Sequence, residues 1–311
     1  MGRTRIADFL RAAARLAFRA PAVHLGARWL CLRGALFGKP PATLNEKIRH
    51  HMAMSRDAKL TLFADKLAVR DFVAQRVGQH YLTELFSVHE DAAAFRANGV
   101  IPRRCAIKVT HGSGATILVD DAAARGGAIP HPRPIFPWNA NARLHPDDID
   151  PAELESLLQA WLLSDYSQLK AEWAYRNVPR RIIVEELLGT DSEPPPDFKF
   201  WCVNGTVRFI QIDEGRFGRH TRSLHAANGA QLNATIKYPA PSKPPILPSN
   251  FSEMRAVAEE LAAGVAFVRV DLYSVVDRIV VGELTNYPEG GMARMRPKQV
   301  LSAFAVDWEP A

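Results

Sequence analysis

The sequence contains little cysteine. Three cysteines, Cys31, Cys105 and Cys202, are spread over 311 residues. They are too few and too scattered for a disulfide framework or a zinc site. This scarcity favours a reducing, cytoplasmic compartment.

Long hydrophobic runs are missing as well. No uninterrupted apolar stretch reaches the ~18–20 residues that a transmembrane helix needs. Arginines interrupt the N-terminal stretch too often for the apolar core of a signal peptide. A catalytic nucleophile is also not evident, because Ser113 lacks a Gly-x-Ser-x-Gly context and no cysteine has a histidine at a recognisable spacing. We therefore expect neither a membrane-spanning segment nor serine or cysteine nucleophile chemistry.

Acidic side chains are nearly absent from residues 1–45. This segment carries eight basic side chains and one acid, so its net charge is +7 and the remaining 266 residues sum to −1. A core without excess positive charge argues against nucleic-acid binding. Within the segment, residues 6–20 fit an amphipathic helix with Arg11, Arg15 and Arg19 on its polar side. We expect a basic helical arm over residues 1–43, which either contacts anionic lipid at the inner face of the plasma membrane or docks on the protein's own core.

The order of helical and strand patterns predicts an α+β fold. Apolar spacing indicates helices over residues 44–79, 91–97, 151–173 and 251–264. Strand patterns occupy residues 81–88, 102–110, 116–119 and 181–188, and a hairpin over residues 197–213 turns at Asn204-Gly205. Residues 126–146 are rich in proline, glycine and asparagine, which favours a loop.

A second hairpin, over residues 267–285, carries the most informative acidic pair. If Ser274 and Arg278 close a three-residue loop, Asp271 faces Val281 and Glu283 is its diagonal neighbour, roughly 7–8 Å away. Two carboxylates at this separation suit Mg²⁺, which prefers oxygen ligands. The alternative is an edge hairpin with a solvated acidic face.

Several other residues could bind an anion. The turn His111-Gly112-Ser113-Gly114 lies between two strands and can present backbone N–H groups to a phosphate, or it can be a simple turn. Lys108 lies on the strand that enters this turn. Lys66 belongs to a charged helical run that is usually a solvated face.

Charged residues on the later strands have two possible roles. Glu185 and Glu186 are adjacent on a strand, so we expect one to turn inward and the other to meet solvent. Lys199 alternates with aromatic residues and could lie in a cleft or on the wet side of the sheet. The basic residues that follow the first hairpin suit an anionic substrate, or they form a solvated loop; they are Arg216, Arg219, His220 and Arg222.

The order of these motifs resembles the TupA-like ATP-grasp family of polysaccharide-associated proteins. The resemblance covers roughly residues 44–300 and rests on seven segments, which are residues 44–47, 65–70, 107–114, 182–187, 197–205, 269–273 and 282–285. It implies an ATP-grasp fold in which two antiparallel β subdomains with flanking helices clasp a nucleotide. We expect a helical segment over residues 44–104 and the nucleotide-binding and catalytic domain over residues 105–311.

The resemblance also implies where ATP binds. Lys66 and Lys108 would contact the α- and β-phosphates, and the turn at residues 111–114 would close over them. Backbone groups of Glu186 and Leu187 would contact the adenine edge, with Glu185 nearby. Either Asp191 or Glu193 would hold the ribose.

The metal and the transferred phosphoryl group have implied ligands too. Asp271 and Glu283 would bridge Mg²⁺ to the phosphates, and Arg269 would stabilise the transferred phosphoryl group. Lys199 and Arg219 complete the predicted catalytic set. ATP-grasp enzymes usually have Asn two residues after the metal glutamate, whereas this chain has Thr285 there and Asn286 next.

The implied activity is that of an ATP- and Mg²⁺-dependent carboxylate–amine ligase. Its substrates would be a small-molecule or glycan-precursor carboxylate and an amine donor, joined through an acyl-phosphate during cell-envelope polysaccharide biosynthesis. Two alternatives keep the fold: an ATP-dependent sugar kinase, and a non-catalytic ATP-binding scaffold of a polysaccharide assembly complex.

Overall fold

The computed structural model describes residues 40–132, 138, 140–189, 195–215 and 219–310. The predicted arm up to residue 39 lies outside the described residues. So do Arg216 and both candidate ribose ligands, Asp191 and Glu193.

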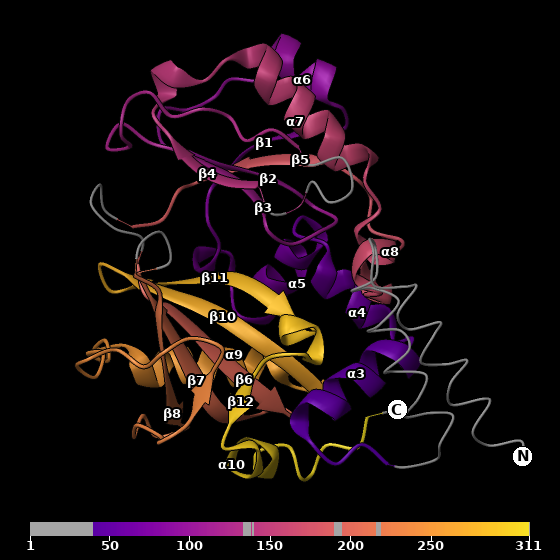
Figure 1. Ribbon diagram of the computed structural model, residues 1–311, viewed down its shortest axis with the longest axis vertical. Helices are drawn as coiled ribbons and strands as arrows, with labels where there is room; N and C mark the ends of the chain where they lie inside the picture. Colours follow the sequence, from indigo (N-terminus) through magenta and orange to yellow (C-terminus); the bar gives the residue numbers. More distant parts are fainter. Residues whose placement is uncertain (1–39, 133–137, 139, 190–194, 216–218, 311) are drawn as a thin grey trace, which may run out of the picture.

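Two five-stranded sheets form the framework, one above the other in Figure 1. The first has the strand order β1-β5-β2-β3-β4, and the second has the order β11-β10-β6-β7-β8. The strands of the first sheet are β1 (Leu85–His89), β2 (Cys105–Val109), β3 (Ala115–Val119), β4 (Ala140–Leu144) and β5 (Ile182–Glu185). Those of the second sheet are β6 (Asp197–Val203), β7 (Thr206–Glu214), β8 (Thr221–Ala226), β10 (Phe267–Val275) and β11 (Arg278–Thr285). The predicted pair of antiparallel sheets is confirmed, except that β3 and β4 are parallel.

Strand β4 corrects the prediction of a loop over residues 126–146. Ala140 lies opposite Ala115 of β3, and the pairing continues to Leu144. The sequence of β4 contains no β-branched residue, so its own propensity for strand is low. Its partner strand, rather than its composition, gives it the extended structure.

Helices cover one face of each sheet (Figure 1). On the first sheet, α6 (Ala92–Asn98) and α7 (Pro151–Leu163) bury Phe95, Leu157 and Trp161 against alternate strand residues. On the second sheet, α9 (Phe251–Ala262) packs on the strand residues that include Phe200 and Val268. Each sheet therefore has one apolar face under helices. On the second sheet, part of the opposite face is also covered, because Trp201 and Phe209 pack in a core with Ile48 of the N-terminal helical region, and the rest carries polar side chains.

Short elements complete the fold. They are α8 (Tyr166–Lys170), α10 (Lys298–Ala303), β9 (Thr235–Ile236), β12 (Met295–Arg296) and the 3-10 helices η1 (Gln79–Tyr81), η2 (Pro146–Asp148), η3 (Trp173–Tyr175) and η4 (Pro288–Gly291). Among the described residues, no helix has the length and apolar character needed to cross a membrane.

The predicted helical stretch over residues 44–79 is divided into three helices, α3 (Leu44–Met54), α4 (Ala58–Ala64) and α5 (Ala68–Arg76). Asp57 caps α4 by accepting a hydrogen bond from the Lys59 amide. The Asp65 side chain accepts from the Leu67 and Ala68 amides at the start of α5. Polar side chains at these breaks compete with the helical backbone, which explains why one periodic pattern gives separate helices.

Helix α3 holds a distant part of the chain. Lys47 Nζ donates to the carbonyls of Ala305 at 2.7 Å and Trp308 at 2.6 Å. Asn45 Nδ2 donates to the Ala293 carbonyl at 2.7 Å, and Arg49 donates to the Gly291 carbonyl. This contact, which we call the α3 clamp, fixes the chain that follows β11.

The hairpin of β10 and β11 differs from the prediction in its turn. The loop has two residues, Val276 and Asp277, both with positive φ, as a type I′ turn requires. Leu272 pairs with Val281, and the register then shifts so that Asp271 lies directly opposite Glu283. The predicted three-residue loop and diagonal placement were therefore wrong, while the predicted shared face of Asp271 and Glu283 is confirmed, because the two-residue turn combined with a bulge at Gly282 places Glu283 directly opposite Asp271.

Candidate nucleotide and metal site

The second sheet carries a row of buried polar side chains on the face opposite α9. In register across the strands, Asp271 of β10 lies beside Lys199 of β6, which lies beside Gln211 of β7. We call this surface the polar face; its buried members are Asp197, Lys199, Gln211, Asp213, Arg222, Arg269 and Asp271. Charges buried in such number require partners, since an unpaired buried charge is strongly unfavourable.

Asp271 is the centre of this network. Arg269 Nε donates to its Oδ1 at 2.7 Å, and Arg269 also donates to its Oδ2 at 2.7 Å. Lys199 Nζ donates to Oδ2 at 2.6 Å and to Asp197 at 2.5 Å. Burial alone would raise the pKa of Asp271, but Arg269 and Lys199 outweigh it and hold that pKa below its usual range. The carboxylate is thus kept charged in a buried place.

The other predicted metal ligands have different surroundings. Glu283 is half-buried, and its carboxylate makes no hydrogen bond or ion pair with any described residue. Thr285 Oγ1 accepts from Arg269 at 3.0 Å. Asn286 Nδ2 donates to the Leu60 carbonyl of α4 at 2.7 Å, while its buried Oδ1 has no partner among the described residues. The hairpin therefore brings Asp271, Glu283 and Thr285 together, and α4 holds the Asn286 amide.

The first sheet contributes Lys108 and Glu185, which share the face opposite α7. Lys108 Nζ forms an ion pair with Glu185 Oε1. Thr83 Oγ1 donates to Glu185 Oε2 at 2.9 Å, and Arg70 lies 3.4 Å from the same oxygen. Burial would raise the pKa of Glu185, but Lys108, Thr83 and Arg70 together lower it. As predicted, Glu185 turns inward, whereas Glu186 remains partly exposed.

Lys66 lies in the turn between α4 and α5, next to the glycine turn. Its Nζ donates to the Gly112 carbonyl, and its amide donates to the Thr110 carbonyl at 3.5 Å. Burial lowers the pKa of Lys66, while Glu283 of the second sheet raises it and Lys108 of the first sheet lowers it. Lys66 thus responds to charges of both sheets.

The glycine turn is shaped by its aromatic neighbours. A Cβ at Gly112 would lie 2.2 Å from the Trp138 ring, so this position requires glycine. His111 is buried, stacks edge-on against Trp138 at 5.0 Å and contacts the Trp161 carbonyl at 3.1 Å through Nε2. Burial lowers the pKa of His111 to about 4. The His111 side chain therefore packs in the core beneath the first sheet. The exposed Ser113 and the backbone up to Gly114 remain the candidate phosphate contacts.

The segment predicted to contact adenine has unpaired backbone groups. The Glu186 amide donates to the Glu84 carbonyl at 2.9 Å. The Glu186 carbonyl and the Leu187 amide make no hydrogen bond with described residues. One acceptor and one donor on consecutive residues match the donor and acceptor of an adenine edge. We call residues 186–187 the adenine segment.

Sequence reasoning missed several members of the site. Arg70 and Thr83, which fix Glu185, gave no signal because their partner is more than a hundred residues away in the chain. Glu172 is buried, and burial raises its pKa to about 8 against the opposing charge of Lys170. Arg219, predicted to be catalytic, lies exposed at the surface.

The donor set fits a magnesium ion held jointly by protein and phosphate. Asp271 Oδ1 accepts one hydrogen bond, and a carboxylate oxygen has two lone pairs, so one lone pair remains for a cation. Glu283 has both oxygens free among the described residues. Within that part of the chain, no group of three His, Cys, Asp or Glu residues could hold a metal ion. Two carboxylates are the usual protein share for Mg²⁺ that also binds substrate phosphates.

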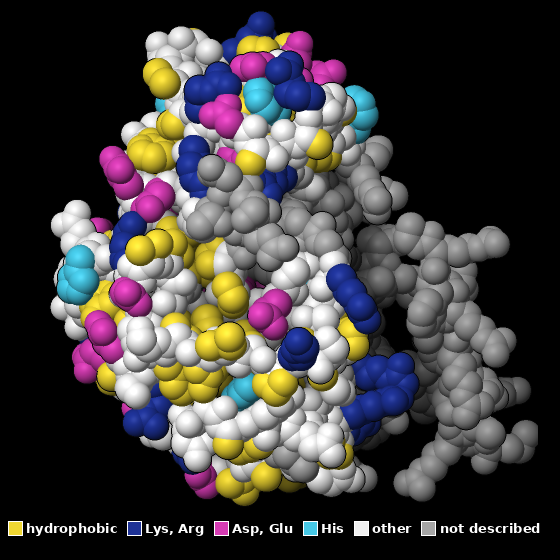
Figure 2. Space-filling view, turned by 90° about the vertical axis from the view of Figure 1, so that its left-hand side faces the viewer, with side chains coloured by type: hydrophobic (Ala, Val, Ile, Leu, Met, Phe, Trp, Pro, Cys, Tyr) yellow, Lys and Arg dark blue, Asp and Glu magenta, His cyan; other side chains and the backbone are white. Residues whose placement is uncertain are grey.

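On the face shown in Figure 2, hydrophobic side chains gather in the middle of the molecule, while charged side chains of both signs are mixed around its upper end. Two sheets with facing cations, a glycine turn and a carboxylate pair define the nucleotide-clasping class of ATP-grasp proteins. A family model for TupA-like ATP-grasp proteins matches residues 46–303. The chain belongs to this family, and the predicted resemblance and fold are confirmed.

Solved structures of low identity include several ligases. The ATP-grasp ligase PsnB complexed with minimal precursor is 13% identical, with a TM-score of 0.35 over 73% of this chain and 53% of that one. D-alanine–D-alanine ligase from Bacillus anthracis is 11% identical, with a TM-score of 0.35 over 73% and 58%. The enzyme of the same name from Helicobacter pylori is 9% identical, with a TM-score of 0.34 over 72% and 54%. This chain therefore spans little more than half the length of these proteins, and no curated protein matches it in sequence.

Proposed function

We propose that the protein is an ATP- and Mg²⁺-dependent carboxylate–amine ligase. The observation that carries this proposal is the convergence of partly buried Lys66 and buried Lys199 and Arg269 with Asp271 opposite Glu283. Phosphoryl transfer depends mainly on positioning and charge neutralisation, which this set of residues can provide without a protein nucleophile.

The proposed phosphate contacts lie on and beside the first sheet, and the proposed metal ligands lie on the second. Lys66 and Lys108 hold the α- and β-phosphates, and the turn at residues 111–114 covers them. Asp271 and Glu283 hold Mg²⁺, with Thr285 beside them. ATP would supply the phosphoryl group: a carboxylate oxygen of the substrate forms the new O–P bond of an acyl-phosphate, and ADP leaves with the electron pair of the broken P–O bond. Mg²⁺ would offset the negative charge of the phosphates.

Arg269 and Lys199 stand next to the metal ligands and stabilise negative charge during the transfer. The attacking amine then forms the C–N bond of the amide, and phosphate leaves with the electron pair of the broken C–O bond. Since Arg269 also donates to Thr285 and Asp271, its guanidinium is oriented before substrate binds.

We place the reaction on a cell-envelope polysaccharide or its precursor, at the cytoplasmic face of the membrane. Support comes from the family resemblance and from the +7 charge of residues 1–45, which suits anionic lipid. Co-sedimentation of the full chain with phosphatidylglycerol vesicles, compared with a chain lacking residues 1–39, tests the location. Equal binding of both proteins would contradict a role for the arm.

The reaction is tested by phosphate release from ATP with Mg²⁺, screened across uronic-acid and amino-acid substrates. A ligase yields an amide, identified by mass spectrometry. A phosphate ester would indicate a sugar kinase instead. ATP binding without turnover would indicate a scaffold, and absence of ATP binding in calorimetry would overturn the proposal.

A further inference from the structure

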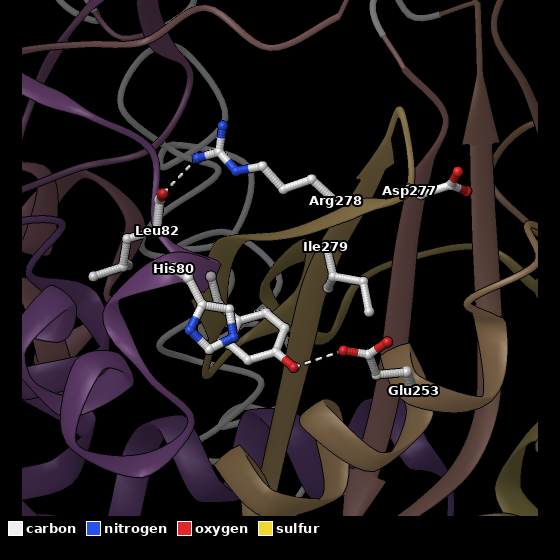
Figure 3. A pocket seen from close by; sticks show the side chains of 7 residues that line it. His80, Leu82, Glu253, Asp277, Arg278 and Ile279 are labelled. Atoms are coloured by element: carbon white, nitrogen blue, oxygen red, sulfur yellow. Dashed lines mark hydrogen bonds between the residues drawn. The ribbon is translucent and has the colours of Figure 1, made fainter.

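Arg278 connects the tip of the metal-binding hairpin to the first sheet. It is the first residue of β11, and its two terminal nitrogens lie 2.9 Å and 3.2 Å from the two carboxylate oxygens of Glu186. The second of these nitrogens also donates to the Leu82 carbonyl at 2.7 Å, as Figure 3 shows. One guanidinium thus holds two segments of the chain beside the hairpin.

Glu186 is itself fixed on both sides. Its Oε2 accepts from the Glu84 amide at 3.1 Å, and its own amide donates to the Glu84 carbonyl at 2.9 Å. The side chain and amide of Glu186 are therefore engaged, while the groups directed at adenine in the proposed function, its carbonyl and the Leu187 amide, are not. A shift of the Glu186 side chain would move these two groups.

Arg278 lies at the opposite end of the hairpin from the proposed metal ligands. Arg278 pairs with Val275, which shares a strand face with Tyr273 and Asp271. At roughly 3.4 Å per residue, Arg278 lies about 17 Å along β11 from Glu283. The same face therefore carries the metal ligands at one end and the contact with the adenine segment at the other.

We propose that Arg278 and Glu186 form a strap that sets the separation between the adenine segment and the metal-binding hairpin. Arg278 is then a positioning residue for an adenine nucleotide, which it holds in place through Glu186 without touching it. The inference rests on the proposed function, because it assumes that ATP lies between these two places.

Calorimetry on the full chain tests the strap with three probes, namely ATP with Mg²⁺, AMP, and tripolyphosphate with Mg²⁺. In Arg278→Met, we expect the dissociation constants of ATP and AMP to rise about threefold to fivefold, as suits a partly exposed ion pair. Tripolyphosphate lacks adenine, so its affinity should not change.

Arg76→Met is the matched control. Arg76 is also partly exposed and joins two elements, because it donates to Glu260 at 3.3 Å and to the Ala263 carbonyl at 2.8 Å. It should lower the melting temperature about as much as Arg278→Met does, while nucleotide affinity stays unchanged. Glu186→Gln should weaken ATP binding as Arg278→Met does, and the double variant should be no weaker than either single one.

Two results would overturn the strap while the wild-type chain still binds ATP. One is unchanged ATP affinity in Arg278→Met. The other is an equal loss for tripolyphosphate, which would show general loosening of the fold. If the wild-type chain binds none of the three probes, the proposed function fails, and the strap fails with it.

Discussion

The free faces of the two sheets hold charge in different ways. On the first sheet, Lys108 and Glu185 form one ion pair beside apolar neighbours such as Ala106 and Ile183. On the second sheet, Lys199, Arg269 and Asp197 of the polar face form one network around Asp271. The first arrangement can grip a ligand with one cation, whereas the second can hold several charges at fixed positions. Under the proposed function, this difference would assign nucleotide binding to the first sheet and the phosphoryl transfer to the second.

The largest expected effect comes from replacing, one at a time, the two acids that face each other on the second sheet. Asp271→Ala should destabilise the fold by about 3–5 kcal/mol, because it leaves buried cations without their partner. Glu283→Ala should change stability by no more than about 0.5 kcal/mol, since its carboxylate makes no hydrogen bond or ion pair with a described residue and acts on Lys66 only through longer-range charge attraction. Both variants should reduce ATP-dependent phosphate release at least about a hundredfold. Urea unfolding and a phosphate assay provide the measurements, and a strongly destabilised Glu283→Ala would contradict the distinction.

Low pH should destabilise the fold through two buried histidines, one near each sheet. Burial lowers the pKa of His51 on α3, and of His111 beside the first sheet, from 6.5 to about 4. The unfolded chain binds these protons first, so stability is fully present above pH 6.5 and is lost as the pH falls toward 4. Each histidine should cost about 2 kcal/mol at pH 5.

Urea unfolding between pH 7.5 and 5 measures this loss. His51→Phe and His111→Phe should each remove about half of the pH dependence that the two residues cause. Wild-type pH dependence in both variants would show that other groups are responsible.

A smaller effect is expected from the bulge that places Glu283. A Cβ at Gly282 would lie 2.5 Å from the Tyr273 ring, so Gly282→Ala forces the ring or the bulge to move. We expect a loss of about 1–2 kcal/mol in stability and weaker Mg²⁺-dependent ATP binding. Gly264→Ala, at a turn beyond α9, is the control: it should lower stability without changing ATP affinity. Unchanged ATP affinity in Gly282→Ala would indicate that the register of Glu283 is not critical.

The smallest effect concerns Thr285. Thr285→Asn supplies the amide oxygen usual in ATP-grasp enzymes, and this oxygen can still accept the hydrogen bond from Arg269. We expect a severalfold lower Mg²⁺ requirement, equivalent to about 1 kcal/mol, and almost no change in stability. Titration of phosphate release with Mg²⁺ checks this, and a higher requirement would mean that the hydroxyl is the better neighbour for this metal.

Local chemistry made much of the fold predictable. Asn204 and Gly205 both adopt the positive φ that their residue types tolerate, and the hairpin forms where expected. The second hairpin was predicted as a hairpin, but its turn was not, because Val276 has no intrinsic preference for positive φ. Strand β4 was missed for a related reason, since its structure depends on a parallel partner.

The site was predictable in its residue types but not in its partners. Alternation with aromatics brought Lys199 into consideration, yet its link to Asp271 spans 72 positions. The sequence likewise gave no sign that Thr83 and Arg70 hold Glu185. Candidate carboxylates and cations can be found from local patterns, whereas the ion pairs that fix them arise only from packing. The ligand roles themselves and the domain boundaries remain predictions.

The α3 clamp has a consequence for how the protein is made. Leu44 and Lys47 bond to residues 258 to 261 positions later, such as Ser302 and Trp308. On the ribosome, α3 emerges long before these partners, and contacts between such distant residues form slowly. The hairpin of β10 and β11 and the chain that follows it are also synthesised late. A nascent chain stalled before residue 300 would therefore expose α3 and its unpaired apolar face, which makes this helix a natural contact for chaperones during synthesis.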